Sequence, residues 1–181
     1  MNIIQPHRNG DSGFLVSPAL CIDLDGTIRK SKTGRHIEKP EDIVLLPNVE
    51  ATLWNYKNQG YYICGCTNQG GVAHGFKTPA DNVAELEYMS SLFQRNPIDF
   101  ITFAYHMDDG KIFPYNMRSL LRKPDYGMLV QCEVFAWQKG IVIDWGKSLF
   151  VGDRPEDKGC ADAARIRFQW AKVFFKWDAE R

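Results

Sequence analysis

The fold of this 181-residue chain is decided by residues 19–27, which read ALCIDLDGT. Asp23 and Asp25 directly follow a short apolar run and flank Leu24. Such a run is typical of a buried strand in a parallel sheet, and ligands of such sheets bind beyond the carboxyl ends of the strands. Side chains alternate along a strand, so the two carboxylates point to the same side. Gly26 then allows the chain to turn sharply.

Two carboxylates at this spacing repel each other unless a proton or a cation joins them. Mg²⁺ is a natural partner for Asp23 and Asp25, because hard cations take oxygen ligands. The plainer interpretation is a turn or a helix N-cap built from Asp and Gly. The pattern alone does not decide between the two.

Further along the chain, apolar stretches alternate with helix-like stretches. Pro47 and Gly60 suit the start and the stop of a helix, and Thr78 with Pro79 suits the N-cap and first turn of another. This alternation predicts an α/β fold, with a mainly parallel central sheet covered by helices on both faces. We expect strands over residues 19–24, 61–66, 100–105, 148–151 and 168–174, and helices over residues 47–59, 78–94, 126–139 and 155–165.

Charge and cysteine content limit the class of protein. Lys and Arg number 22, as do Asp and Glu, so the formal net charge is zero, which argues against bulk electrostatic binding of nucleic acid. The 5 cysteines are odd in number and lie mostly in apolar runs. They favour buried, reduced thiols in a cytoplasmic protein.

Domain organisation is simple. Residues 1–17 are predicted to form a loosely ordered N-terminal arm without an apolar signal core, and residues 18–181 a single domain. The sequence contains no apolar stretch near the ~20 residues that span a bilayer, so we expect no membrane association. We expect a monomer or a weak dimer.

Polar residues also follow three later elements of the predicted fold. Residues 67–71 read TNQGG, a hydroxyl and an amide followed by glycines whose N–H groups suit phosphate, although the same residues make a plain turn. Arg122 and Lys123 precede a helix, where a solvated loop is the plainer interpretation. Asp153 and Asp157 bracket the start of another helix, where they could serve only as helix N-terminal charges.

The order of an acid pair, a hydroxyl, a lysine and another acid at successive strand ends resembles the haloacid dehalogenase-like (HAD) phosphohydrolase superfamily. Residues 23–27 match its first motif, Thr67 its second, Lys123 its third, and Gly152-Asp153 with Asp157 its fourth. The resemblance covers roughly residues 18–175 and implies a three-layer Rossmann-like HAD fold.

Two stretches resemble more closely the subgroup of histidinol-phosphate phosphatase and heptose-bisphosphate phosphatase. They are TNQGGVA at residues 67–73 and RKPDYGM at residues 122–128. Several members of this subgroup carry a Cys/His zinc loop, where this chain has only His106 as a candidate ligand, and one His cannot form a structural zinc site. We therefore expect no zinc, and a loop over residues 107–121 held by its own apolar residues, namely Ile112, Phe113 and Leu120.

The resemblance implies a role for each motif residue. Asp23 would be the nucleophile that forms an aspartyl-phosphate, and Asp25 the general acid and then base. Thr67 and Lys123 would bind the phosphoryl oxygens. The implied cofactor is Mg²⁺, held by the side chains of Asp23 and Asp153 and the main-chain carbonyl of Asp25, and supported by Asp157.

The substrate is less constrained by the sequence. The intervals between motifs are too short for a large cap domain, so an open site is expected. Asn68, Arg122 and Arg29 are predicted to bind substrate, and a solvated surface is the plainer interpretation of the basic loop that contains Arg29. That loop carries Arg29, Lys30, Lys32, Arg35, His36 and Lys39.

The leading hypothesis is a Mg²⁺-dependent phosphomonoester hydrolase that acts on a small phosphorylated metabolite, of the sugar phosphate, sugar bisphosphate or histidinol-phosphate type. The alternative is a polynucleotide 3′-phosphatase that acts on nucleic-acid ends. A third reading, an inactive HAD-like binding module, is less favoured because Asp23, Asp25, Lys123 and Asp153 are all present.

Overall fold

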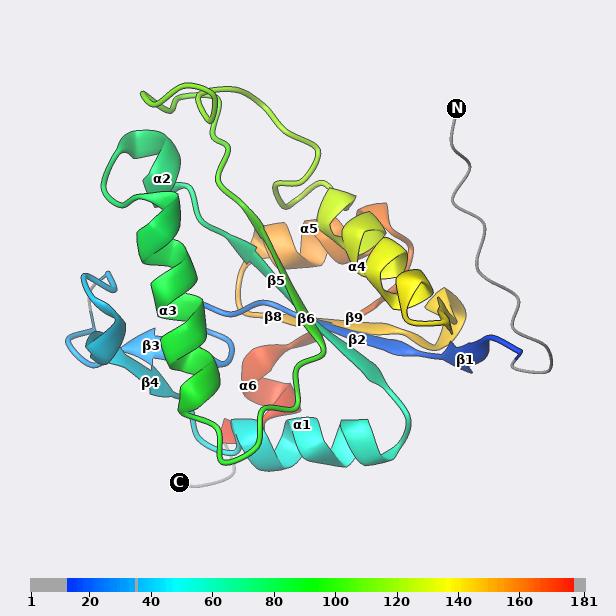
Figure 1. Cartoon of the computed structure of the whole chain (residues 1–181). Coiled ribbons are helices and arrows are strands. Elements are labelled where there is room, and N and C mark those ends of the chain that lie inside the picture. Colours follow the sequence, from blue (N-terminus) through cyan, green and yellow to red (C-terminus); the bar gives the residue numbers. More distant parts are fainter. Residues whose placement is uncertain (1–12, 35, 178–181) are drawn as a thin grey trace.

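A computed structural model of the protein describes residues 13–34 and 36–177. A five-stranded sheet, parallel throughout, forms its centre (Figure 1). This architecture confirms the predicted α/β class. The strands lie in the order β6 (Phe100–Ala104), β5 (Tyr62–Asn68), β2 (Ala19–Ile22), β8 (Leu149–Gly152) and β9 (Arg167–Trp170).

Helices cover both faces of the sheet and complete the three layers. Alternate residues of β2 separate the two cores: Leu20 and Ile22 pack with one helical layer, and Ala19 and Cys21 with the other. The first layer holds α1 (Val49–Asn58), α3 (Pro79–Ser91) and α6 (Ala171–Phe174), and the second holds α4 (Gly127–Gln138) and α5 (Pro155–Ala163).

The predicted last strand is only partly correct. β9 ends at Trp170, and residues 171–174 form α6 instead of extended chain. Ala171 and Phe174 are both buried, and their spacing of three residues places them on one face of a helix, whereas a strand would alternate.

The end of the predicted N-terminal arm, which was expected to be loosely ordered, contains a strand. The last residues of the arm form β1 (Leu15–Ser17), which pairs in parallel with β7 (Ile141–Ile143). The rest of the predicted arm, residues 1–12, lies outside the described residues.

A small antiparallel sheet follows the acid pair. It joins β3 (Arg29–Ser31) to β4 (Ile43–Leu45), with the short 3₁₀ helix η1 (Pro40–Asp42) between them. Part of the predicted basic loop is therefore a strand. Arg35 lies outside the described residues.

The segment between β6 and α4 contains no helix or strand within the described chain, which agrees with the expectation that no large cap domain is inserted there. The predicted apolar support of this segment is wrong, because Phe113 is 80% and Leu120 69% exposed, and Ile112 is also exposed. Main-chain hydrogen bonds hold it instead. Both Lys111 N and Ile112 N donate to Ala73 O of the short helix α2 (Gly71–His74), and Gly127 N donates to Leu120 O.

Two local predictions are confirmed. Thr78 caps α3 by a reciprocal capping box with Asp81 and is followed by Pro79 in the first turn. All five cysteines are buried and free. No helix in the described part of the chain is long and apolar enough to cross a membrane.

Candidate active site

The site begins at the carboxyl end of β2, where the chain turns immediately. Gly26 adopts φ +90°, a left-handed conformation that favours glycine, and a Cβ atom there would lie 2.2 Å from Oδ2 of Asp153. The hydroxyl of Thr27 lies 3.4 Å from Asp153 Oδ1. The turn after Asp23 and Asp25 thus brings the ends of β2 and β8 together.

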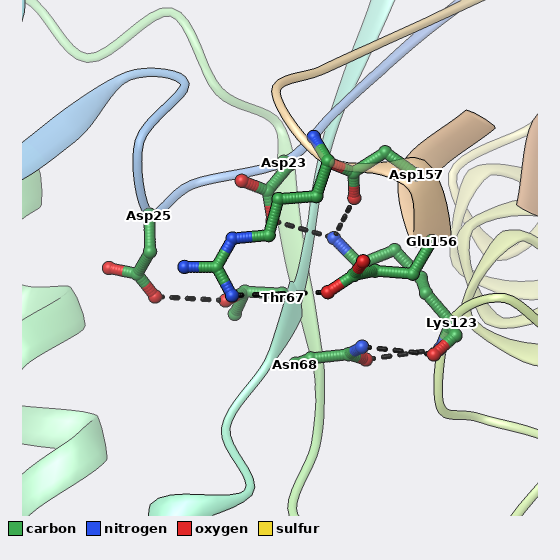
Figure 2. Close-up of a pocket in the computed structure, with 8 residues that line it drawn as sticks. Asp23, Asp25, Thr67, Asn68, Lys123, Glu156 and Asp157 are labelled. Carbon is green, nitrogen blue, oxygen red and sulfur yellow. Dashed lines mark hydrogen bonds and ion pairs between the residues drawn. The ribbon is translucent and has the colours of Figure 1, made fainter.

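Lys123 lies at the centre of the site and contacts two carboxylates (Figure 2). Its Nζ atom lies 2.6 Å from Asp23 Oδ1 and 2.7 Å from Asp157 Oδ1, and it also donates to Cys66 O at 2.8 Å. The Lys123 side chain is 2% exposed. One buried ammonium therefore faces two buried carboxylates.

A third carboxylate, Asp153, completes an acidic cluster. Asp23, Asp153 and Asp157 each offer an oxygen, and the three oxygens lie within 4.8 Å of one another. Asp157 is held rigidly, because its Oδ2 accepts hydrogen bonds from Asp153 N at 3.1 Å and Arg154 N at 2.9 Å. The resemblance to the HAD superfamily implies such a grouping of these three carboxylates.

The electrostatics reflect this excess of negative charge. The pKa of Asp23 is raised to about 7, because burial and the neighbouring Asp157 and Asp25 together outweigh the opposing attraction of Lys123. Burial and Asp157 also raise the pKa of Asp153. Burial lowers the pKa of Lys123, but the attraction of Asp23 and Asp157 raises that pKa by more, so Lys123 stays protonated.

Asp25 points away from this cluster and is held by four donor contacts. Gln69 Nε2 lies 2.6 Å and Thr67 Oγ1 3.3 Å from Asp25 Oδ2. Arg29 donates from Nε at 2.8 Å and from Nη2 at 3.4 Å. Burial alone would raise the pKa of Asp25, but Arg29 and the hydrogen bond from Gln69 lower it.

Two predicted substrate-binding residues have other partners. Arg29 is 0% exposed and pairs with Asp25, so its prediction as a rim residue is wrong: it sits on strand β3, which turns its side chain inward. Asn68 lines the pocket, but its amide donates to Lys123 O and accepts from Lys123 N, both at 3.0 Å. These two bonds position the Lys123 loop.

Arg122, the third predicted substrate-binding residue, does not line the pocket itself, although its neighbour Lys123 does. Arg122 is partly buried, its Nη1 atom has no hydrogen-bond partner, and that atom lies close to Gly70. Burial lowers the pKa of Arg122, and Glu156 and Asp109 oppose this effect. A partly desolvated guanidinium beside the pocket is suited to an anionic group of the substrate.

The pocket itself brings together residues from four segments. Sequence reasoning missed Arg154 and Glu156, because loop residues beside a helix start look like surface charges. It also missed the role of Gln69, whose only signal was its place next to Asn68 in the TNQGG stretch. The pocket is lined by Asp23, Asp25, Thr67, Asn68, Lys123, Arg154, Glu156 and Asp157.

This fold and this site define a HAD-type phosphatase, a phosphoric monoester hydrolase. The family model described as polynucleotide kinase 3 phosphatase matches residues 19–175, and the chain belongs to that family. The match includes every strand of the central sheet and every motif residue of the site.

Curated relatives carry a more specific name. D-glycero-beta-D-manno-heptose-1,7-bisphosphate 7-phosphatase of Yersinia pestis is 31% identical over 151 residues, covering 82% of this chain and 77% of the relative. The protein of that name from Escherichia coli K12 is 29% identical over 82% of this chain and 75% of its own length.

Solved structures agree on the fold. A protein assigned as a HAD-like phosphatase from Mesorhizobium loti superimposes with a TM-score of 0.71 and 25% identity, covering 87% of this chain and 73% of that one. The D,D-heptose 1,7-bisphosphate phosphatase of B. bronchiseptica, solved with magnesium and phosphate, superimposes with a TM-score of 0.66 and 21% identity. The match covers 83% of this chain and 78% of that one.

Proposed function

We propose that the protein is a Mg²⁺-dependent phosphatase that hydrolyses a small phosphorylated sugar through an aspartyl-phosphate on Asp23. The observation that carries this proposal is the pairing of one buried lysine with a cluster of three carboxylates. The named activity of the curated relatives supports the sugar phosphate class. The buried, reduced cysteines support a cytoplasmic location, which is part of the same proposal.

The residues of the acidic cluster fit a divalent cation. Asp23 Oδ2 is buried and has no hydrogen-bond partner, and Lys123 neutralises only part of the negative charge around it. Asp23 and Asp153 would hold Mg²⁺ by their side chains and Asp25 by its main-chain carbonyl, with Asp157 in support. Bound Mg²⁺ offsets the charge of carboxylate and phosphate, so that one anion can approach the other.

The side chains then divide the reaction into two steps. In the first, the Asp23 carboxylate forms a bond to phosphorus, the bond from phosphorus to the ester oxygen breaks, and Asp25 gives its proton to that oxygen. In the second, Asp25 takes a proton from water, and the resulting hydroxide displaces Asp23 from phosphorus. Thr67 and Lys123 bind the phosphoryl oxygens in both steps.

Asp25 must be protonated before the first step, although its surroundings lower its pKa. A phosphate dianion in the neighbouring pocket acts in the opposite sense, because a nearby like charge disfavours the carboxylate form. Substrate binding therefore favours the protonation that the reaction needs.

The second candidate is a polynucleotide 3′-phosphatase, which the description of the matching family favours. The burial of Arg29 weakens it, because a backbone-binding rim loses a cation that the sequence placed there. Net charge gives no support either, since acids and bases are equal in number.

A screen of phosphorylated metabolites and of 3′-phosphorylated oligonucleotides tests the proposal. Wild-type protein should release phosphate from a sugar phosphate or bisphosphate with Mg²⁺, and Asp23→Asn should be inactive with an unchanged circular dichroism spectrum. Preferential hydrolysis of the oligonucleotides would favour the second candidate. Near-wild-type turnover by Asp23→Asn would rule out the nucleophile.

A further inference from the structure

The carboxylate of Asp25 belongs to a closed ring of five side chains joined by polar contacts, and the other four side chains do not line the pocket. Asp25 contacts Arg29 at 2.8 Å, and Arg29 Nη2 lies 3.6 Å from Glu85 Oε2. The two Glu85 oxygens lie 2.7 and 2.9 Å from Lys77 Nζ. Lys77 Nζ in turn donates to Gln69 Oε1 at 3.3 Å, and Gln69 Nε2 returns to Asp25 at 2.6 Å.

The ring is balanced in charge, and three of its five members are buried. Arg29 is 0%, Glu85 2% and Gln69 5% exposed, whereas the side chains of Asp25 and Lys77 are 33% and 18% exposed. The two cations, Arg29 and Lys77, match the two anions, Asp25 and Glu85. Buried ion pairs of this kind are a weak source of stability, because the cost of desolvation offsets the attraction. We therefore expect the ring to fix the orientation of its side chains more than to stabilise the fold.

Lys77 determines which way the Gln69 amide faces. With its carbonyl toward the Lys77 ammonium, Gln69 presents its NH₂ group to Asp25. The reversed amide would place a carbonyl against the carboxylate and NH₂ against the ammonium, and both contacts would be repulsive. Gln69 Nε2 also lies 2.9 Å from Thr67 Oγ1, so the same amide aligns a second pocket residue.

Glu85 has a matching effect on Arg29. It lies on α3, in the first layer of helices, and shares the Arg29 guanidinium with Asp25. Without Glu85, Arg29 would have Asp25 as its sole carboxylate partner among these residues and would bind it more tightly. The Asp25 carboxylate would then be drawn toward Arg29 and away from the leaving oxygen.

We infer that Glu85 and Lys77 are positioning residues for Asp25: acting through Arg29 and Gln69, they fix where the Asp25 carboxylate lies relative to the leaving group. This inference rests on the role of Asp25 proposed above. Neither residue lines the pocket, so neither is expected to contact the phosphoryl group.

Leaving-group dependence tests it, because a purely structural defect slows all substrates alike. The leaving group of glycerol 1-phosphate is an alkoxide, which needs a proton from Asp25. The leaving group of p-nitrophenyl phosphate is a stable phenolate, which needs that proton little. We would measure kcat/KM, which reports the first transfer to Asp23, for both substrates with wild type, Glu85→Gln, Lys77→Met and Asp25→Asn.

A matched control is available at the other end of β5. Lys57→Met breaks the half-buried ion pair with Asp99, whose carboxylate also accepts from Ile63 N. This variant should lower the melting temperature slightly and change kcat/KM for both substrates by the same factor. If Glu85→Gln fails to fold, Lys77→Met decides the question, because the Lys77 side chain is 18% exposed and Met keeps its apolar stem.

Glu85→Gln and Lys77→Met are expected to lose roughly 10- to 100-fold on glycerol 1-phosphate and less than about threefold on p-nitrophenyl phosphate, in the same direction as a larger effect of Asp25→Asn. The inference would be overturned, and the proposed function kept, if Glu85→Gln and Lys77→Met lose equally on both substrates while Asp25→Asn loses mainly on glycerol 1-phosphate. If Asp25→Asn is itself unselective, the acid role of Asp25 fails and the inference fails with it.

Discussion

Lys123 Nζ lies 2.6 Å from Oδ1 of Asp23, although 100 residues separate the two along the chain. The contact is almost wholly buried, with 2% of the Lys123 side chain and 8% of the Asp23 side chain exposed. Asp157 adds a second buried carboxylate at 2.7 Å from the same ammonium. Lys123 therefore joins the end of β2 to the first turn of α5, in addition to its proposed contact with the phosphoryl group.

Replacement of Lys123 by Met should reduce both activity and stability. The variant loses a donor to the phosphoryl group, which is worth roughly 10²–10³ in kcat. It also leaves Asp23 and Asp157 buried without a cation, which costs about 3–5 kcal/mol of unfolding free energy. Urea unfolding and phosphate release measure the two effects, and Mg²⁺ should restore part of the lost stability by neutralising the carboxylates.

Lys158→Met provides the control for that variant. Lys158 pairs with Asp162 at 2.6 Å, but both side chains are more than half exposed, so the pair contributes less than about 1 kcal/mol. Similar unfolding free energies for the Lys123 and Lys158 variants would contradict the structural role assigned to Lys123.

Mg²⁺ should stabilise the folded protein through the acidic cluster. A ligand that binds only the native state at 100 times its dissociation constant adds about 2.7 kcal/mol, and for a protein of this length that raises Tm by roughly 5–10 °C. Asp153→Asn should abolish most of this shift, because Asp153 belongs to the cluster, whereas Asp162→Asn should keep it. A Mg²⁺-dependent shift that survives Asp153→Asn would place the cation elsewhere.

The central residues of the site could be predicted from the sequence because they lie at the ends of apolar strands. Asp23, Thr67 and Asp153 each stand at a strand end, and parallel strands bring those ends to one edge. Arg29 was misplaced because nothing in a polar loop shows that this residue begins a strand with its side chain facing inward. Glu85 could not be predicted for a similar reason: on α3 a charged residue normally faces water, whereas Glu85 is buried against Arg29 of β3 and Lys77.

Gly152→Ala should disable the site without replacing a charged residue. A Cβ atom at residue 152 would lie 2.4 Å from Cβ and from Oδ2 of Asp157, so Asp157 must move. Its hydrogen bonds from Asp153 N and Arg154 N and its contact with Lys123 would be disturbed together. We expect a loss of activity and of about 1–3 kcal/mol of unfolding free energy, as for other overpacked sites.

Gly146→Ala is the matched control, since its Cβ would meet Asp144 Oδ1 at 3.4 Å, an ordinary contact. It should retain both activity and Mg²⁺ stabilisation. Full activity of Gly152→Ala would show that the position of Asp157 matters little.

Arg122 should discriminate between bisphosphorylated and monophosphorylated sugars. Its Nη1 atom is buried without a hydrogen-bond partner, and a partly desolvated guanidinium gains most from a bidentate phosphate. Arg122→Met should therefore raise KM for a sugar bisphosphate by roughly 10-fold or more, the loss expected for a charge-assisted hydrogen bond, and change KM for the monophosphate little. Arg118→Met is the control, because the Arg118 side chain is 79% exposed and its carboxylate partner Asp125 lies 3.5 Å away. Equal increases in KM for both substrates would instead assign Arg122 to the transferred phosphoryl group, where the loss of its charge affects every substrate alike.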